Sequence, residues 1–185
     1  MREHAAILEA LGATVVFVRK PSDLEVVSGL VIPGGESTTL HLLIESAGLK
    51  APLAERLDAG MATLGTCAGM ILLASTVLDG RIDQQPFGAI ELDVRRNGYG
   101  RQLDSFEADV DLTELPGATV HGVFIRAPVI EKVSADVDVL AYLTGSNQPP
   151  VPVACHQEKI TVTAFHPELA GETYFHERFL ADARS

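Results

Sequence analysis

The chain has 185 residues, a size typical of one domain that can bury a sizeable core. Its formal net charge of −11 argues against a nucleic-acid or anionic-membrane surface, and no apolar run approaches the length of a membrane span. Its two cysteines, Cys67 and Cys155, make no disulfide framework, and the start shows no signal-peptide pattern, so we predict a cytoplasmic protein.

Predicted helices and strands alternate along the first half of the chain. In order they are a helix at Glu3–Leu11, strands at Thr14–Val18 and Gly29–Ile32, helices at Thr38–Ala47 and Ala51–Ala59, a strand at Met61–Thr66 and a helix at Ala68–Leu78. This alternation predicts a parallel sheet with helices on both faces and a site at the carboxyl ends of its strands.

The second half of the chain is rich in predicted strands. They cover Phe87–Val110 with a turn at Asn97-Gly98-Tyr99-Gly100, then Val120–Arg126, Val137–Leu143, Val151–Cys155 and Ile160–Phe165, before a last helix at Tyr174–Asp182. The middle of the chain is therefore predicted to be an antiparallel insertion on the parallel sheet, and Gly145–Pro150 a loop. Neither an internal repeat nor a dividing linker is evident, which predicts a single domain over residues 1–185.

Residues Gly65-Thr66-Cys67-Ala68-Gly69 lie between a strand-like and a helix-like apolar run. Glycines two residues before and after a cysteine match the nucleophile-elbow pattern, in which small neighbours let the chain turn sharply from strand to helix. The N-terminus of the following helix would favour a thiolate. Cys67 is therefore a candidate nucleophile, although a small buried cysteine in a glycine-rich turn is the alternative.

Residues Phe165-His166-Pro167-Glu168 follow the predicted strand Ile160–Phe165. In an extended segment, residues two apart point to the same side, so Glu168 is predicted to orient the imidazole of His166. His166 could then act as a base toward Cys67 and as an acid toward a leaving amine. The alternative is a solvated pair at a strand end.

A third segment, Pro33-Gly34-Gly35-Glu36-Ser37, ends another apolar run. A Pro-Gly-Gly turn before Ser and Thr is typical of a strand that leads through a tight turn into a capped helix. Backbone N–H groups of this turn, together with that of Ala68, could stabilise a developing oxyanion. An ordinary strand–turn–helix connection would show the same pattern.

The motifs PGGES, GTCAG and FHPE, in this order and spacing, resemble those of class I glutamine amidotransferases. Within that family, the segments Val94–Asp109 and Val123–Pro128 are similar to the glutaminase subunits of pyridoxal 5′-phosphate synthase. The resemblance covers essentially the whole chain. It implies a flavodoxin-like, three-layer α/β/α fold with a mostly parallel central sheet and an antiparallel insertion.

The resemblance also assigns an activity and its residues. It implies hydrolysis of the side-chain amide of L-glutamine by Cys67 as nucleophile, His166 as base and acid, and Glu168 as the orienting carboxylate. It assigns glutamine binding to Gly34, Gly35, Glu36, Arg96, Ile125 and Arg126. It assigns the oxyanion hole to Gly35 and Ala68. It implies no cofactor and no metal. The partner implied is a synthase subunit that receives the ammonia within a hetero-oligomeric complex.

The chain departs from the family at its start. Family members open with an apolar strand ahead of the segment that matches Arg2-Glu3-His4, so the sheet is predicted to lack that first strand. An altered start or a damaged protein would each explain this. Two further function classes remain open: another cysteine hydrolase of the same fold, or a non-catalytic docking subunit.

Overall fold

The computed structural model describes residues 1–80, 84–96, 105–145 and 148–185. The helices are α1 (Arg2–Ala10), α2 (Pro21–Leu24), α3 (Ser37–Ser46), α4 (Lys50–Asp58), α5 (Ala68–Leu73) and α6 (Tyr174–Arg184), with a 3₁₀ turn, η1, at Pro167–Leu169. The strands are β1 (Gly29–Ile32), β2 (Ala62–Thr66), β3 (Ala74–Val77), β4 (Ile90–Arg95), β5 (Ser105–Leu112), β6 (Thr119–Ile125), β7 (Val129–Val133), β8 (Asp138–Gly145), β9 (Gln148–Gln157) and β10 (Ile160–Thr163).

The main sheet has the strand order β1-β2-β10-β9-β8-β5-β6. Parallel pairing joins β1 to β2 and β2 to β10, whereas the strands beyond β10 pair antiparallel. A smaller sheet has the order β3-β4-β7. The predicted α/β class and antiparallel insertion are thus confirmed. The parallel part of the sheet consists of three strands, so the seven-stranded sheet is mixed and not mostly parallel as expected.

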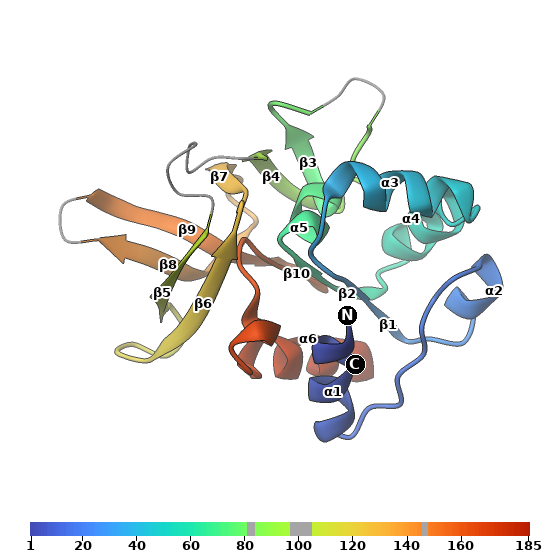
Figure 1. Cartoon of the computed structure of the whole chain (residues 1–185), viewed down its shortest axis with the longest axis horizontal. Coiled ribbons are helices and arrows are strands. Elements are labelled where there is room, and N and C mark those ends of the chain that lie inside the picture. The colour runs from blue at the N-terminus through green and yellow to red at the C-terminus, as the bar shows by residue number, and fades with distance from the viewer. Residues whose placement is uncertain (81–83, 97–104, 146–147) are drawn as a thin grey trace.

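Helices cover both faces of these three parallel strands, which gives three layers (Figure 1). In that view α3, α4 and α5 lie above the strands, and α1 and α6 lie below them. Both α5 and α6 contact β2 and β10, so the two central strands are buried between the helices. All five residues of β2 and all four of β10 are buried, as expected for parallel strands covered on both faces.

The predicted strand at Thr14–Val18 is wrong, because residues 13–19 have no regular structure. A strand needs a neighbour to satisfy its backbone groups, and in the described residues β1 is an edge strand that pairs with β2 alone. A groove of about 850 Å³ separates this segment from the free side of β1, with Leu8, Leu30 and Leu180 among its lining residues.

The predicted helix Ala68–Leu78 is also wrong in its second half. Helix α5 ends at Leu73, and Ala74–Val77 form β3, which pairs with β4. The β-branched residues Thr76 and Val77 favour this strand. The sequence did not predict the short elements α2, β7 and η1, and the predicted turn at residues 97–100 lies outside the described residues.

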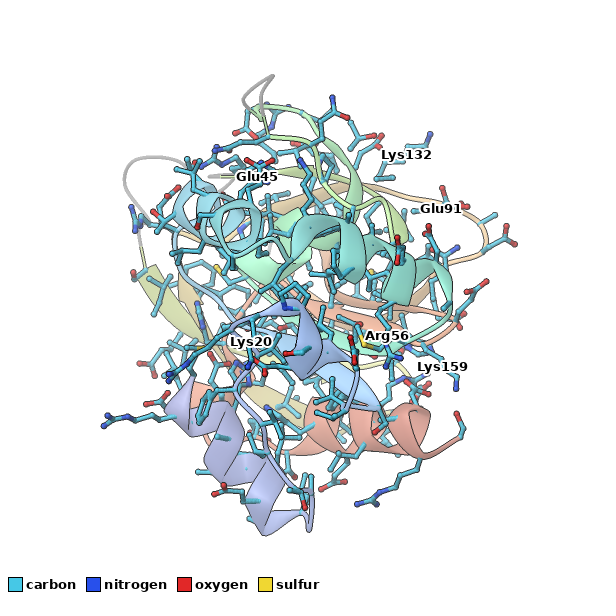
Figure 2. All side chains as sticks on the ribbon, turned by 90° about the vertical axis from the view of Figure 1, so that its right-hand side faces the viewer. Lys20, Glu45, Arg56, Glu91, Lys132 and Lys159 are labelled. Carbon is cyan, nitrogen blue, oxygen red and sulfur yellow. The ribbon has the colours of Figure 1, made fainter. Side chains whose placement is uncertain are left out.

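Charged side chains such as Lys20, Glu91 and Lys132 project from the surface (Figure 2). Arg56 of α4 has a different role, because its Nη2 donates a hydrogen bond of 2.6 Å to the carbonyl of Val27. This bond ties the segment between α2 and β1 to α4. Within the described residues no helix combines the length and apolarity that a membrane crossing needs.

Candidate active site

Cys67 occupies a strained turn between β2 and α5. Its φ of 50° and ψ of −102° lie in a region that residues with a side chain rarely adopt, as expected for a nucleophile elbow. The backbone N–H of Cys67 donates to the carbonyl of Thr163 at the end of β10. The thiol sulfur is thereby held at the carboxyl ends of two parallel strands, where the sequence predicted the site.

The two glycines of the elbow are required by close backbone packing. A Cβ at Gly65 would lie 2.9 Å from the carbonyl carbon of Gly69, and one at Gly69 would overlap the carbonyl oxygen of Ile32. The turn can therefore close only because neither residue carries a side chain. This agrees with the reasoning from the Gly-x-Cys-x-Gly spacing.

His166 and Glu168 contact each other, as predicted, with Nδ1 of His166 2.8 Å from Oε1 of Glu168. The predicted extended geometry is wrong, because β10 ends at Thr163 and Glu168 lies in the 3₁₀ turn η1. That turn, with Pro167 in its first position, folds the carboxylate back onto the imidazole. His166 is 9% exposed and Glu168 is 8% exposed.

Neighbouring aromatic packing fixes the backbone that carries His166. Phe165 is fully buried, with its ring centroid 5.3 Å from that of Phe124 and 5.6 Å from that of Phe175. The backbone N–H of His166 donates to the carbonyl of Val123 on β6 at 2.8 Å. The imidazole is therefore positioned by the core and by the sheet together.

The electrostatics of the pair favour charged forms. Burial alone would lower the pKa of His166, but its hydrogen bonds with Cys67 and Glu168 outweigh burial and raise that pKa to about 9. Burial would likewise raise the pKa of Glu168, but hydrogen bonds from His166 and His4 hold it well below its usual range. At neutral pH the site therefore contains an imidazolium that is hydrogen-bonded to a carboxylate and to the sulfur of Cys67.

Two buried histidines extend this network, and the sequence analysis missed both. Nε2 of His4 lies 3.3 Å from Oε1 of Glu168, and Nδ1 of His4 lies 2.8 Å from Nε2 of His176. His4 belongs to α1 and His176 to α6. The available signal was the spacing of His4 and Leu8, which places a histidine on the apolar face of the predicted first helix.

The turn after β1 lies against the imidazole. A Cβ at Gly34 would overlap the His166 ring, and Gly35 has a φ of +147°, which glycine alone adopts readily. The N–H of Gly34 donates to Oγ1 of Thr66 at 3.1 Å. Ala68 is the first residue of α5, where backbone N–H groups have no partner within the helix. Both predicted oxyanion-hole residues therefore flank the site.

Glu36 and Arg96 are brought together, with Nη2 of Arg96 3.1 Å from Oε1 of Glu36. The carboxylate of Glu36 also caps α3, accepting from the backbone N–H groups of Thr38 and Thr39. Burial opposes ionisation, but the hydrogen bonds from Thr38 and Thr39 together outweigh it and lower the pKa of Glu36 to about 2. The side chain of Glu36 therefore caps α3 and contacts Arg96 at the same time.

Of the remaining predicted residues, Ile125 is the last residue of β6, and Arg126 follows it. The sulfur of Cys67 lies 3.8 Å from the carbonyl oxygen of Ile125, so the backbone there borders the nucleophile. Arg126 is exposed and has a φ of 43°, one of three positive values among the described residues that are not glycine. Such strain is typical of binding and catalytic positions.

The second cysteine is inert. Cys155 is fully buried on β9, and burial raises the pKa of its thiol to about 12. Among the residues that the structure describes, no group of three or more His, Cys, Asp or Glu side chains has the geometry of a metal site.

The sequence model of the SNO glutamine amidotransferase family matches residues 1–185. The chain is 51% identical over its full length to the pyridoxal 5′-phosphate synthase subunit PdxT of Mycobacteroides abscessus, covering 93% of that protein. It is 48% identical to the same subunit of Saccharopolyspora erythraea, with 99% of this chain and 90% of that protein covered. A crystal structure of a glutamine amidotransferase, 40% identical, superposes with a TM-score of 0.88 over 100% of this chain and 94% of that one.

Proposed function

The chain belongs to the SNO glutamine amidotransferase family, and on that premise we propose that it hydrolyses L-glutamine to glutamate and ammonia through Cys67, His166 and Glu168. The match to the family model confirms the family that the sequence motifs indicated. The observation that carries the proposal is the strained turn that places Cys67 beside the 2.8 Å His166–Glu168 pair.

In the first half of the reaction, the thiolate of Cys67 attacks the side-chain amide carbon of glutamine and forms a carbon–sulfur bond. Backbone N–H groups of Gly35 and Ala68 stabilise the oxyanion. The imidazolium of His166 gives its proton to the amide nitrogen, the carbon–nitrogen bond breaks, and ammonia leaves. The products of this half are a thioester on Cys67 and a neutral His166.

In the second half, neutral His166 removes a proton from water, and the resulting hydroxide attacks the thioester carbon. The carbon–sulfur bond breaks, glutamate leaves, and the thiolate of Cys67 is restored beside a protonated His166. Glu168 holds the imidazole through Nδ1, so that Nε2 faces the reacting atoms in both halves.

Glutamine binding is assigned to residues around this centre. The guanidinium of Arg96 is 20% exposed and can present a planar pair of donors to the α-carboxylate of glutamine. The carboxylate of Glu36, already 3.1 Å from Arg96, fixes the direction of that guanidinium. Gly34, Gly35, Ile125 and Arg126 form the surrounding backbone wall.

The partner is a synthase subunit of pyridoxal 5′-phosphate synthase that takes up the ammonia within a hetero-oligomeric complex. The names of the Mycobacteroides abscessus and Saccharopolyspora erythraea relatives support this assignment. A reducing cytoplasm suits the free thiol of Cys67 that the reaction needs.

The partner also completes the oxyanion hole. The N–H of Gly34 is engaged by Thr66, and glycines at 34 and 35 allow the peptide between them to rotate at low cost. Docking of the synthase subunit would drive this rotation and turn a donor toward the oxyanion. Full turnover by the isolated chain would contradict this part of the proposal.

The decisive experiment measures ammonia and glutamate from glutamine, with and without the synthase subunit, for the wild-type chain and for Cys67→Ala. We expect turnover that the synthase subunit stimulates and that Cys67→Ala abolishes. Turnover of other amides but not of glutamine would favour a different cysteine hydrolase of this fold. Binding of the synthase subunit without any turnover would favour a non-catalytic docking subunit.

A further inference from the structure

The carboxylate of Glu168 depends on two imidazoles. Oε1 lies 2.8 Å from Nδ1 of His166 and 3.3 Å from Nε2 of His4, whereas Oε2 is buried without a hydrogen-bond partner in the described part of the chain. One oxygen therefore carries all of the hydrogen bonds that orient this side chain. Without His4, a single bond to His166 would remain.

The protons of the network can be assigned from its chemistry. His176 is fully buried, and burial followed by the nearby His4 lowers its pKa to about 4, so it is neutral and carries one proton at pH 7. Nε2 of His176 lies 2.8 Å from Nδ1 of His4, so one of these two nitrogens donates a hydrogen bond to the other. The carboxylate of Glu168 only accepts hydrogen bonds, so Nε2 of His4, which faces it, carries a proton. With that proton on Nε2, the Nδ1 of a singly protonated His4 accepts from Nε2 of His176.

We propose that His4 is a positioning residue of the catalytic site, which holds the carboxylate of Glu168 toward His166, and that His176 holds His4 in the required tautomer. The chain of hydrogen bonds runs from α6 through α1 to η1 and reaches Cys67 by way of His166. His4 touches no reacting atom, and its effect on turnover passes through Glu168. This inference rests on the proposed glutaminase function.

His4 also meets the strand that bears the nucleophile. Oγ1 of Thr66, the residue before Cys67, lies 3.4 Å from Nε2 of His4 and accepts the N–H of Gly34. The imidazole of His4 therefore contacts Glu168 of the triad and Thr66 next to the nucleophile, and Thr66 in turn binds Gly34. Such outer contacts, when removed, typically lower activity by about 10- to 100-fold in related settings.

The test compares His4→Leu with His4→Gln in the complex with the synthase subunit. Leucine removes the donor, whereas the amide N–H of glutamine can take the place of Nε2–H. We expect His4→Leu to lower kcat by about 10- to 100-fold with KM for glutamine within about twofold, and His4→Gln to recover most of the loss. His156→Leu is the matched control, because His156 is a similarly buried histidine that bonds to Thr161 and not to the triad.

A wild-type kcat in His4→Leu would overturn the proposal, as would equal losses in His4→Leu and His4→Gln. If His4→Leu does not fold, the kcat values of His176→Leu and His176→Gln are compared instead. Only His176→Gln keeps a donor for His4, so it should lose less activity than His176→Leu. Turnover that is absent in the wild-type chain, or unchanged in Cys67→Ala, would instead contradict the glutaminase function itself.

Discussion

Gly34 lies so close to His166 that a Cβ at this position would overlap the imidazole ring. The contact joins the loop after β1 to the base of the candidate triad. Because the ring is held by Glu168 on one side and by Gly34 on the other, the space for His166 is set from two directions. A methyl group at position 34 must therefore displace the imidazole.

We expect Gly34→Ala to lower kcat by at least about 100-fold, since a displacement of about 1 Å at a reacting group costs this much. The measurement is glutamine hydrolysis with the synthase subunit present. Gly145→Ala is the matched control, because no described atom lies within 4 Å of a Cβ there. Equal activity of Gly34→Ala and Gly145→Ala would show that His166 tolerates displacement.

The pKa of His166, raised to about 9, predicts the alkaline limit of activity. A raised pKa means that the protonated form is favoured, and this form donates the proton to the amide nitrogen that leaves as ammonia, so kcat/KM should fall as the pH rises through about 9. Glu168→Gln removes one of the interactions that raise this pKa, which should move the limit to lower pH. Removal of the orienting carboxylate should also lower kcat by about 10²- to 10⁴-fold.

The control for this pH profile is Glu131→Gln, which changes a carboxylate that pairs with Arg95 at the surface. Its profile should match that of the wild-type chain. If the alkaline limit of Glu168→Gln is the same as that of the wild-type chain, the group that titrates there is not His166.

Arg96→Lys should raise KM for glutamine by about tenfold with little change in kcat, because lysine cannot present a planar pair of donors to a carboxylate. Arg95→Lys provides a neighbouring control, since Arg95 pairs with Glu131 instead of Glu36. Steady-state kinetics of the two variants side by side would test the assignment. An unchanged KM in Arg96→Lys would remove Arg96 from the glutamine site.

The lowered pKa of His176 predicts that the protein loses stability in acid. Its pKa is lowered from 6.5 to about 4, so the unfolded chain takes up a proton at a pH where the folded chain does not. The free energy of unfolding should therefore fall as the pH drops from 6.5 to 4, by roughly 3 kcal/mol from this side chain. Urea unfolding of the wild-type chain and of His176→Gln across this range would show the variant to be less sensitive to acid.

His121 gives the opposite sign and serves as the comparison. It lies between Asp109 and Glu107 at 2.9 Å from each, and these bonds raise its pKa. The stabilisation that His121 contributes is therefore present at a pH below its pKa in the unfolded chain. It is lost as the pH rises through its pKa in the folded chain. Because His121 is 41% exposed, the effect should be small.

Local patterns predicted the centre of the site. The glycines around Cys67 are required by contacts within the elbow and with Ile32, and the His166–Glu168 pair is separated by one residue. Features set by distant partners were not predictable. The segment Thr14–Val18 has strand-forming residues but no neighbouring strand, and His4 reaches Glu168 only after α1 packs against η1.

Helix α1 buries two side chains, His4 and Leu8, and the groove of about 850 Å³ runs beside it. A helix with so few buried contacts opens locally at a lower free energy than the sheet does. Each opening would withdraw His4 from Glu168 while Cys67 and His166 keep their strands. Amide exchange in residues 2–10 should therefore be faster than in β2, and mild heating should inactivate the enzyme reversibly before the sheet unfolds.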